Sequence, residues 1–498
     1  MNARVPESAL NAAQALTQVS QAWDDNIVGQ ISHYISIPAK SPMFDAQWAE
    51  HGYLDTVLRN AATWVEAQRV DGLKLEIIRL EGRTPVLFFE VAASRGNAGA
   101  SPERATGAIP PTVVMYGHLD KQPEFTGWRS DLGPWTPKYE NGKLYGRGGA
   151  DDGYAVYASI AAIQALKSQG LAHPRIVGLI ETSEESGSRD LLPYVDALRS
   201  RMGEVALVIC LDSGAGNYDQ LWLTSSLRGM ATGVLKVEIL TEGIHSGDAS
   251  GLVPSSFRIM RQVLDRLEDS ATGRLLPDAF YCDVPADRLA QAQVTAAILG
   301  DEVYRRFPWA HYDCGGATMF ALPTTTDPVQ ALLKRTWLPA LSVTGADGFP
   351  ALQDAGNVLR PYTAFKLSLR LPPLVDAAMA AQQLKALLED NAPYQARVTF
   401  DGLSAGTGWN APTTAPWLEQ AMNAASQSHF GAGCGYIGQG GTIPLMNMLS
   451  KGFPKAQMMV CGVLGPKSNA HGPNEFLHVP YAKKLTAAVA QVIAQVPV

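Results

Sequence analysis

The sequence is poor in cysteine and has no long apolar run. Its five cysteines are odd in number and scattered along 498 residues, and none forms a Cys-X-X-Cys pair. This argues against a disulfide framework or a thiolate zinc site and fits a reducing compartment. No stretch approaches the roughly 20 apolar residues that span a bilayer. No basic stretch followed by an apolar one opens the chain. We therefore expect a cytoplasmic protein with no membrane partner.

Positive charge is also scarce. Lys and Arg number 40 against 47 Asp and Glu, which gives a formal net charge of −7. Because no Lys/Arg cluster is present, we do not expect nucleic acid as a partner. Hydrophobic residues make up 46% and charged residues 17% of the chain, which excludes a disordered chain, a collagen or a coiled coil. The length predicts about two or three domains.

Two patterns of apolar residues divide the chain. Up to about Ser226, short and nearly continuous apolar segments alternate with helical ones. This is typical of an α/β domain with a mostly parallel sheet and helices on both faces. Beyond Ser226, segments 230–240 and 364–371 alternate as half-exposed strands do, and each is followed by a helix. We interpret 227–408 as an α+β domain inserted into an α/β domain formed by 1–226 and 409–498.

Polar residues follow the predicted strands of the α/β domain where each strand ends. In open parallel sheets the ligand crevice lies at the carboxyl ends of the strands, so these residues should gather at one edge. His118 and Asp120 are two apart on an extended chain and should therefore point to the same side. The segments concerned are 117–120, 146–153, 184–187, 212–214 and 469–475.

Each of these residues has an ordinary explanation when it is taken alone. Asp151 or Asp152 could cap the following helix, Glu184 and Glu185 could favour a helix dipole, and Asp212 could sit in a turn. Taken together, clustered carboxylates repel one another unless cations neutralise them. A pair of metal ions would do so. Histidine and carboxylate donors favour zinc and are also compatible with manganese or cobalt.

Eight motifs, in order along the chain, resemble those of the M20 family of metallopeptidases. The resemblance is to its branch of carnosinases and cytosolic nonspecific dipeptidases. It runs from about Gly117 to Glu475. The motifs are YGHLDKQPE, GRGGADDG, ETSEESGS, CLDSG, SLRG, IHSGDASG, QGGTIP and NAHGPNE.

The resemblance implies two divalent metal ions per subunit, bridged by one carboxylate and a water. It assigns His118 and Asp212 to one metal, Glu185 and His471 to the other, and Asp151 to both. Glu184 would be the general base, and Asp120 would orient His118. The peptide bond from Asp151 to Asp152 would be cis.

The inserted domain would act as lid and dimerisation domain of a homodimer. By the same resemblance, His245 would cross the dimer interface and stabilise the oxyanion in the partner's site. Gly441 and Thr442 would line the substrate site and hold a carboxylate. Arg360 would assist them, although it sits about one position away from where this branch places its arginine.

The expected function is hydrolysis of dipeptides or very short peptides with a free C-terminal carboxylate. One alternative is an N-acyl or N-carbamoyl amino-acid amidohydrolase that uses the same site. A second is a binding or scaffold relative without catalysis, for which a metal ligand or the general base should be missing.

Two residues depart from the sequence patterns of M20 branches. Gly153 stands where dipeptidases usually have Lys, and Asp212 stands where the deacylase branches usually have Glu.

Overall fold

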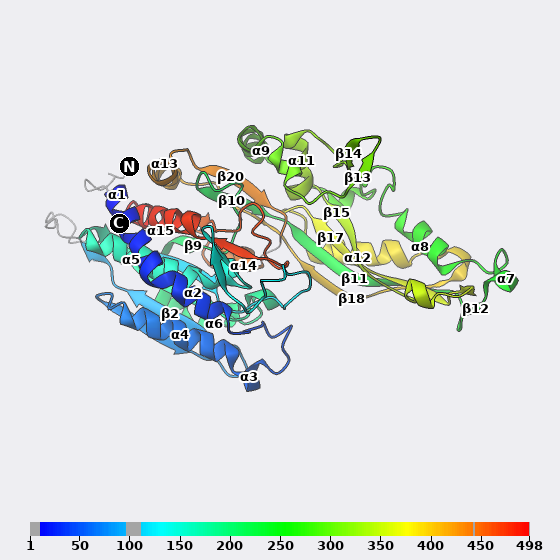
Figure 1. Ribbon diagram of the computed structural model, residues 1–498, viewed down its shortest axis with the longest axis horizontal. Helices are drawn as coiled ribbons and strands as arrows, with labels where there is room; N and C mark the ends of the chain where they lie inside the picture. Colours follow the sequence, from blue (N-terminus) through cyan, green and yellow to red (C-terminus); the bar gives the residue numbers. More distant parts are fainter. Residues whose placement is uncertain (1–9, 96–110, 442–443, 498) are drawn as a thin grey trace. The chain divides into compact units, whose positions relative to one another are not determined.

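The computed structural model describes residues 10–95, 111–441 and 444–497. The chain divides into two compact units (Figure 1). The first unit comprises Met1–Thr224, Ala411–Ile437 and Met448–Val498, and the second comprises Ser225–Asn410 and Gly438–Asn447. The division differs from our sequence interpretation in Gly438–Asn447, which groups with the second unit rather than with the α/β domain. It also differs by two residues at each end of the insert, because the second unit runs from Ser225 to Asn410.

The first unit is built around a six-stranded sheet with the order β1-β2-β8-β4-β9-β21. Strands β8, β4, β9 and β21 run parallel, whereas β2 runs antiparallel to both of its neighbours. Every residue of β4 is buried, as expected for a sheet that is covered on both faces. The strands are β1 Leu73–Ile78, β2 Val86–Val91, β4 Thr112–His118, β8 Arg175–Glu181, β9 Val205–Cys210 and β21 Gln457–Val460.

Helices cover both faces of this sheet. On one face Gly117 lies so close to helix α5 (Ala155–Ser168) that an added Cβ would be 2.5 Å from Ala155 Cβ. Gly117, Ile180 and Leu87 are register partners across three strands and share that face, so Phe88 points to the other. There the guanidinium of Arg201, on α6 (Leu191–Met202), lies 4.6 Å from the centre of the Phe88 ring.

Further helices complete the first unit, and α1, α5 and α15 pack against one another (Figure 1). A π-helical turn at Trp23–Ile27 joins α1 to α2, so the three form one continuous helical stretch. The helices are α1 Ala12–Ala22, α2 Val28–Ile35, α3 Trp48–His51, α4 Tyr53–Ala67, α13 Pro416–Phe430, α14 Pro444–Gly452 and α15 Val479–Ile493.

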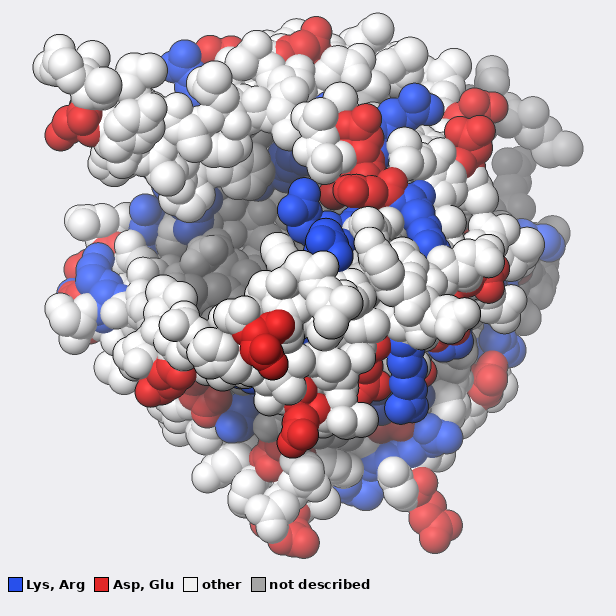
Figure 2. All heavy atoms as spheres, turned by 90° about the vertical axis from the view of Figure 1, so that its right-hand side faces the viewer, with Lys and Arg blue, Asp and Glu red and all other residues white. Residues whose placement is uncertain are grey.

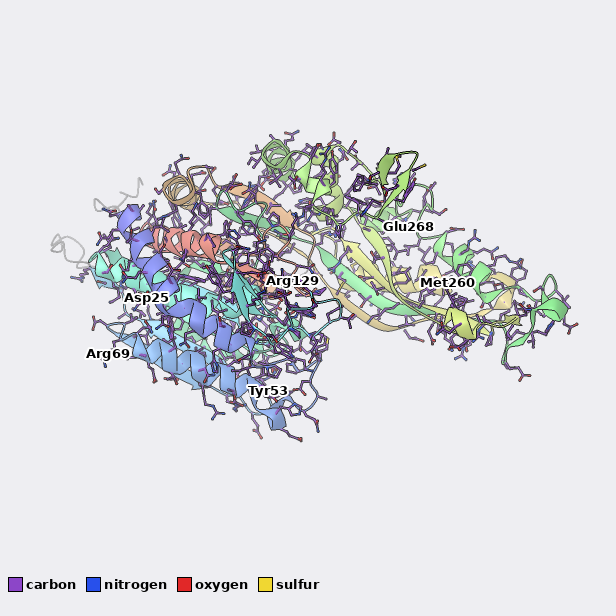
Figure 3. The ribbon with its side chains drawn as sticks, viewed as in Figure 1. Asp25, Tyr53, Arg69, Arg129, Met260 and Glu268 are labelled. Carbon is purple, nitrogen blue, oxygen red and sulfur yellow. The ribbon has the colours of Figure 1, made fainter. Side chains whose placement is uncertain are left out.

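The second unit contains a four-stranded antiparallel sheet with the order β15-β17-β11-β18. Buried residues alternate with less buried ones along β11, so this sheet has one covered face. Helices α8 and α12 cover it, and Met260 of α8 is fully buried in the core between them (Figure 3). The elements are β11 Gly229–Glu238, β15 Ala340–Asp347, β17 Tyr362–Leu371, β18 Arg397–Gly406, α8 Ser256–Leu264 and α12 Ala377–Glu389.

The second unit also contains helices and strands that were not predicted from the sequence. Three helices and an exposed hairpin lie between α8 and β15. Two short strands, β12 and β16, pair with each other. These elements are α9 Ala286–Leu299, α10 Glu302–Arg305, α11 Pro328–Thr336, β13 His311–Cys314, β14 Ala317–Phe320, β12 Ile244–His245, β16 Val358–Leu359 and the short helix α7 Ser246–Ala249.

The remaining strands are short. They form a three-stranded sheet β19-β10-β20, another three-stranded sheet β22-β6-β5, and the pair β3-β7. Their bounds are β3 Ser94–Arg95, β5 Lys138–Glu140, β6 Lys143–Tyr145, β7 Ala172–His173, β10 Trp222–Leu227, β19 Trp409–Asn410, β20 Gly435–Gln439 and β22 Phe476–His478.

The charged residues on the surface and the lengths of the helices are consistent with the composition of the sequence. Figure 2 shows one face on which Lys and Arg side chains are interspersed with Asp and Glu among uncharged residues. None of the helices in the described part of the chain combines the length and apolar character that a membrane crossing needs.

Candidate metal centre

Five predicted site residues of the first unit lie at or just beyond the carboxyl ends of three neighbouring strands: His118, Asp120, Glu184, Glu185 and Asp212. Asp151 lies instead in the turn Gly149–Gly153 before α5, and His471 lies in the loop between β21 and β22. His118 ends β4, which pairs in parallel with both β8 and β9. The 3-10 turn Glu184–Ser186 follows β8, and Asp212 lies two residues after β9. Since parallel neighbours end on the same side, the chain brings these residues to one edge of the sheet.

Asp151 lies between two histidines and offers one carboxylate oxygen to each. His118 Nε2 is 3.4 Å from Asp151 Oδ1 and 3.8 Å from an oxygen of Asp212. His471 Nε2 is 3.0 Å from Asp151 Oδ2 and 3.3 Å from an oxygen of Glu185. Two groups of ligand atoms result, His118–Asp151–Asp212 and Asp151–Glu185–His471, and within each group all atoms lie within 4.8 Å of one another.

Burial and crowding shift the protonation of this cluster. Burial raises the pKa of Asp212 to about 6, against the opposing effect of His118. Burial and the neighbouring Asp151 raise the pKa of Glu185 to about 8. Burial lowers the pKa of His471, but Glu185 and Asp151 outweigh it and raise that pKa to about 9. Bound protons therefore offset the concentrated negative charge here, and divalent cations would take their place.

The residues present fit divalent metal ions. His118 is completely buried, and within the described residues its Nε2 makes no hydrogen bond. A buried imidazole nitrogen that faces two carboxylates without a hydrogen bond is suited to metal ligation. The donors are imidazole nitrogen and carboxylate oxygen, a set that suits zinc, manganese or cobalt.

The contacts of Asp120 differ from those expected. His118 Nδ1 is 3.4 Å from the Asp120 carboxylate, but its hydrogen bond is to the backbone carbonyl of Asp120, at 3.1 Å. The Asp120 carboxylate instead accepts the backbone N–H groups of Glu184 at 3.1 Å and Glu185 at 3.0 Å. Asp120 therefore fixes the Glu184–Glu185 turn as well as supporting His118.

Comparison with known proteins identifies the family of the chain. The profile of peptidase family M20/M25/M40 matches residues 114–495. The chain belongs to this family. It is 25% identical over 386 residues to the cysteinylglycine-S-conjugate dipeptidase of Corynebacterium striatum, covering 75% of this chain and 80% of that protein. It is 26% identical over 420 residues to the β-Ala-His dipeptidase of Mus musculus, covering 81% and 78% respectively.

A solved structure shares the fold. The crystal structure of human carnosine dipeptidase 1 superposes with a TM-score of 0.75 at 21% identity, covering 98% of this chain and all of that one. The M20 resemblance and the fold class expected from the sequence are both confirmed. As a member of this family with dipeptidase relatives, the chain is a metallopeptidase of the dipeptidase kind.

Three further predicted site residues, His245, Arg360 and Gly441, lie in the second unit. His245 ends β12 and is exposed, and Arg360 directly follows β16, the strand that pairs with β12. The Arg360 side chain donates its Nε–H to the carbonyl of Gly348 at 2.8 Å. Gly441 is exposed, and Thr442 lies outside the described residues.

Several residues of the M20 motifs received no role from the sequence. Asp152, joined to Asp151 by the expected cis peptide bond, accepts the His118 N–H at 3.3 Å. Gln122 donates to the Glu185 carboxylate at 2.6 Å. The fully buried ammonium of Lys121 donates to backbone carbonyls at the end of α2, and Arg147 pairs with Glu475. Their positions in the sequence could have identified them, because each lies within a few residues of a proposed ligand.

Proposed function

We propose that this M20 peptidase hydrolyses the peptide bond of dipeptides or very short peptides with a free C-terminal carboxylate. The observation that carries the proposal is the Asp151 carboxylate between His118 and His471, which supplies two adjoining groups of metal donors. The dipeptidase names of the curated relatives support the substrate class.

The proposed metal ligands fall into the two groups of donor residues described above. His118 and Asp212 would hold one divalent ion, Glu185 and His471 the other, and Asp151 both. Zinc is the ion we favour, given imidazole and carboxylate donors. When bound, two such ions acidify water and polarise a carbonyl oxygen, which is the chemistry that peptide hydrolysis needs.

Glu184 is proposed as the general base. Its backbone is held by Asp120, and it belongs to neither group of metal donors, so its carboxylate remains available for proton transfer. Burial and the nearby Asp212 hold its pKa well above the usual range of a glutamate, which suits a group that must take up a proton near neutral pH. Glu184 would take a proton from the attacking water and pass it to the leaving amine.

The second unit would supply groups that bind the substrate. We propose a homodimer in which the exposed His245 imidazole reaches the partner's site and stabilises the oxyanion by hydrogen bonding. Arg360, the backbone at Gly441, and Thr442 would bind the terminal carboxylate. The attraction of a guanidinium for a carboxylate supports this role for Arg360.

Amine release from two sets of substrates tests the function. The protein is stripped with a chelator, reconstituted with zinc or manganese, and given free dipeptides and N-acyl or N-carbamoyl amino acids. We expect metal-dependent cleavage of free dipeptides with the blocked substrates intact. Cleavage of blocked substrates alone would assign the protein to the amidohydrolases, and no cleavage of either set by the metal-loaded protein would contradict the proposal.

A further inference from the structure

His471 is held differently from the other proposed ligands. The side chains of His118, Asp151, Glu185 and Asp212 are at most 7% exposed, whereas that of His471 is 53% exposed. His471 also has a φ of +65°, in the left-handed region that a residue with a side chain rarely adopts. Three more residues of the same segment, Lys467, Asn469 and Asn474, have positive φ. Such a segment keeps its shape only where its surroundings fix it.

Arg147 holds the segment that contains His471 in place by hydrogen bonds to the backbone of that segment. Its Nη2 donates to the carbonyl oxygens of His471 at 3.0 Å and Gly472 at 2.9 Å. Its Nη1 donates to the Glu475 carboxylate at 2.6 Å. The side chains of Arg147 and Glu475 are 1% and 0% exposed, so both charges are fully removed from water. One guanidinium therefore holds both ends of the turn that presents the His471 imidazole.

The same pair also reaches the segments that carry two of the other proposed ligands, Asp151 and His118. Glu475 accepts the N–H of Gly148 on its carboxylate at 3.0 Å and the N–H of Gly146 on its backbone carbonyl at 3.0 Å. Gly148 lies three residues before Asp151. Arg147 Nε donates to the carbonyl of Pro123, at 3.1 Å, in the segment that follows His118 and Asp120.

A lesser contact also supports the segment. The backbone N–H of Arg129, which is labelled in Figure 3, donates to the Asn474 side chain at 2.7 Å. This bond is exposed and involves no charged group, so Arg147 and Glu475 provide the buried, charge-assisted contacts.

We infer that Arg147, paired with Glu475, is a positioning residue that holds His471 in place to bind the metal shared with Asp151 and Glu185. The inference rests on the proposed two-metal function. A guanidinium suits the task because its planar fork reaches several acceptors in fixed directions, which an ammonium cannot do. Supporting residues of this kind typically change metal affinity by about 10–100-fold when they are replaced.

Zinc binding to the chelator-stripped full-length chain tests this role. We expect two zinc ions per chain in the unaltered protein. In Arg147→Met we expect one ion bound as before and the other weakened by about 10–100-fold. Arg147→Lys keeps a charge beside Glu475 but loses the fork, so the second ion should remain weakened. Two ions bound with unaltered affinity in a folded Arg147→Met protein would overturn the inference.

Arg175 offers a matched control. It also donates to a backbone carbonyl, that of Met202 at 3.1 Å, and to a carboxylate, that of Glu90 at 2.9 Å. It lies at the start of β8, the end of the strand opposite to the proposed ligands. Arg175→Met should therefore bind two zinc ions with unchanged affinities, and loss of an ion there too would show a general effect on folding and overturn the inference.

A double variant separates positioning from the cost of a buried unpaired charge. Arg147→Met leaves the Glu475 carboxylate without its cation, which is unfavourable in itself. In Arg147→Met/Glu475→Gln that charge is gone, so we expect the thermal midpoint to recover while the second zinc ion stays weakly bound. Recovery of the second ion in the double variant would overturn the inference. This variant also keeps the test available if the single one does not fold.

His471→Ala distinguishes failure of this inference from failure of the proposed function. If the unaltered protein binds fewer than two ions, or His471→Ala binds as many as the unaltered protein, the two-metal function itself is contradicted. If His471→Ala loses one ion while Arg147→Met keeps both, only the positioning role is contradicted.

Discussion

At the scale of the residue, Asp151 and Asp120 show how two carboxylates that both approach His118 serve different purposes. Asp151 turns its two oxygens toward two imidazoles, which hold its pKa below the usual range although burial opposes this. Asp120 accepts two backbone N–H groups instead and fixes the turn that carries Glu184 and Glu185. The first carboxylate is thus placed to ligate, and the second to hold others in place.

Replacing Glu184 tests its assignment as the general base. Glu184→Gln keeps the size of the side chain but cannot take up a proton, so turnover should fall by about 10²–10⁴-fold. The metal content should not change, because Glu184 belongs to neither donor group. The measurement pairs initial rates on a free dipeptide with metal analysis of the same sample. Glu50→Gln, an exposed residue of α3, is the control and should retain full activity.

The sequence predicted the residues that converge but not all of their contacts. Polar residues at the ends of parallel strands meet in the case of His118, Glu185 and Asp212. Asp151 and His471 lie elsewhere, before α5 and before β22, so only their match to known motifs accounts for them. The contacts of Asp120 and the pair Arg147–Glu475 depend on which backbone groups lie within hydrogen-bond reach. Arg147 and Glu475 are 328 residues apart along the chain. No local sequence pattern predicts a contact between residues that are so far apart in the chain.

At the scale of the element, the sheet of the first unit was predictable because buried parallel strands are apolar throughout. All residues of β4 and nearly all of β8 are buried. The antiparallel direction of β2 was not predictable, since β2 is as apolar as the mutually parallel strands β4, β8 and β9. The composition of a strand shows whether both of its faces are buried, but not whether its neighbours run parallel or antiparallel to it.

In the second unit the predicted elements have a clear buried face, whereas most of the unpredicted ones lack one. Helix α11 is an exception, because it buries Ala331, Leu332, Leu333 and Thr336. Strands β11 and β17 alternate between buried and less buried residues, and helices α8 and α12 bury one side. Strands β13 and β14 are exposed at every position, so no alternation marks them. Helix α9 buries only Arg288, Thr295 and Ala296, which gives no apolar stripe to detect.

At the scale of the whole molecule, the proposed role of His245 requires a second copy of the chain. His245 is exposed on the short pair β12–β16, where the neighbouring Arg360 follows β16. An exposed imidazole on this short pair of strands would be available to another subunit. The homodimer is therefore part of the proposed mechanism rather than an addition to it.

Mixing two inactive variants tests whether His245 acts on the partner's site. His245→Ala and Glu184→Gln should each be strongly impaired alone. In a mixed dimer, one site has Glu184 from one chain and His245 from the other, so about a quarter of the unaltered activity should return if subunits exchange at random. No recovery, despite subunit exchange shown by native mass spectrometry, would contradict the crossed arrangement. His311→Ala, on the exposed hairpin β13–β14, is the control and should remain active.

The central claim is that Asp151 joins two metal sites, and a crystal structure of the zinc-loaded protein with anomalous diffraction at the zinc edge tests it most directly. We predict two anomalous peaks, one beside His118 and Asp212 and the other beside Glu185 and His471, with Asp151 in contact with both. A single peak, or two peaks of which Asp151 touches at most one, would contradict the account.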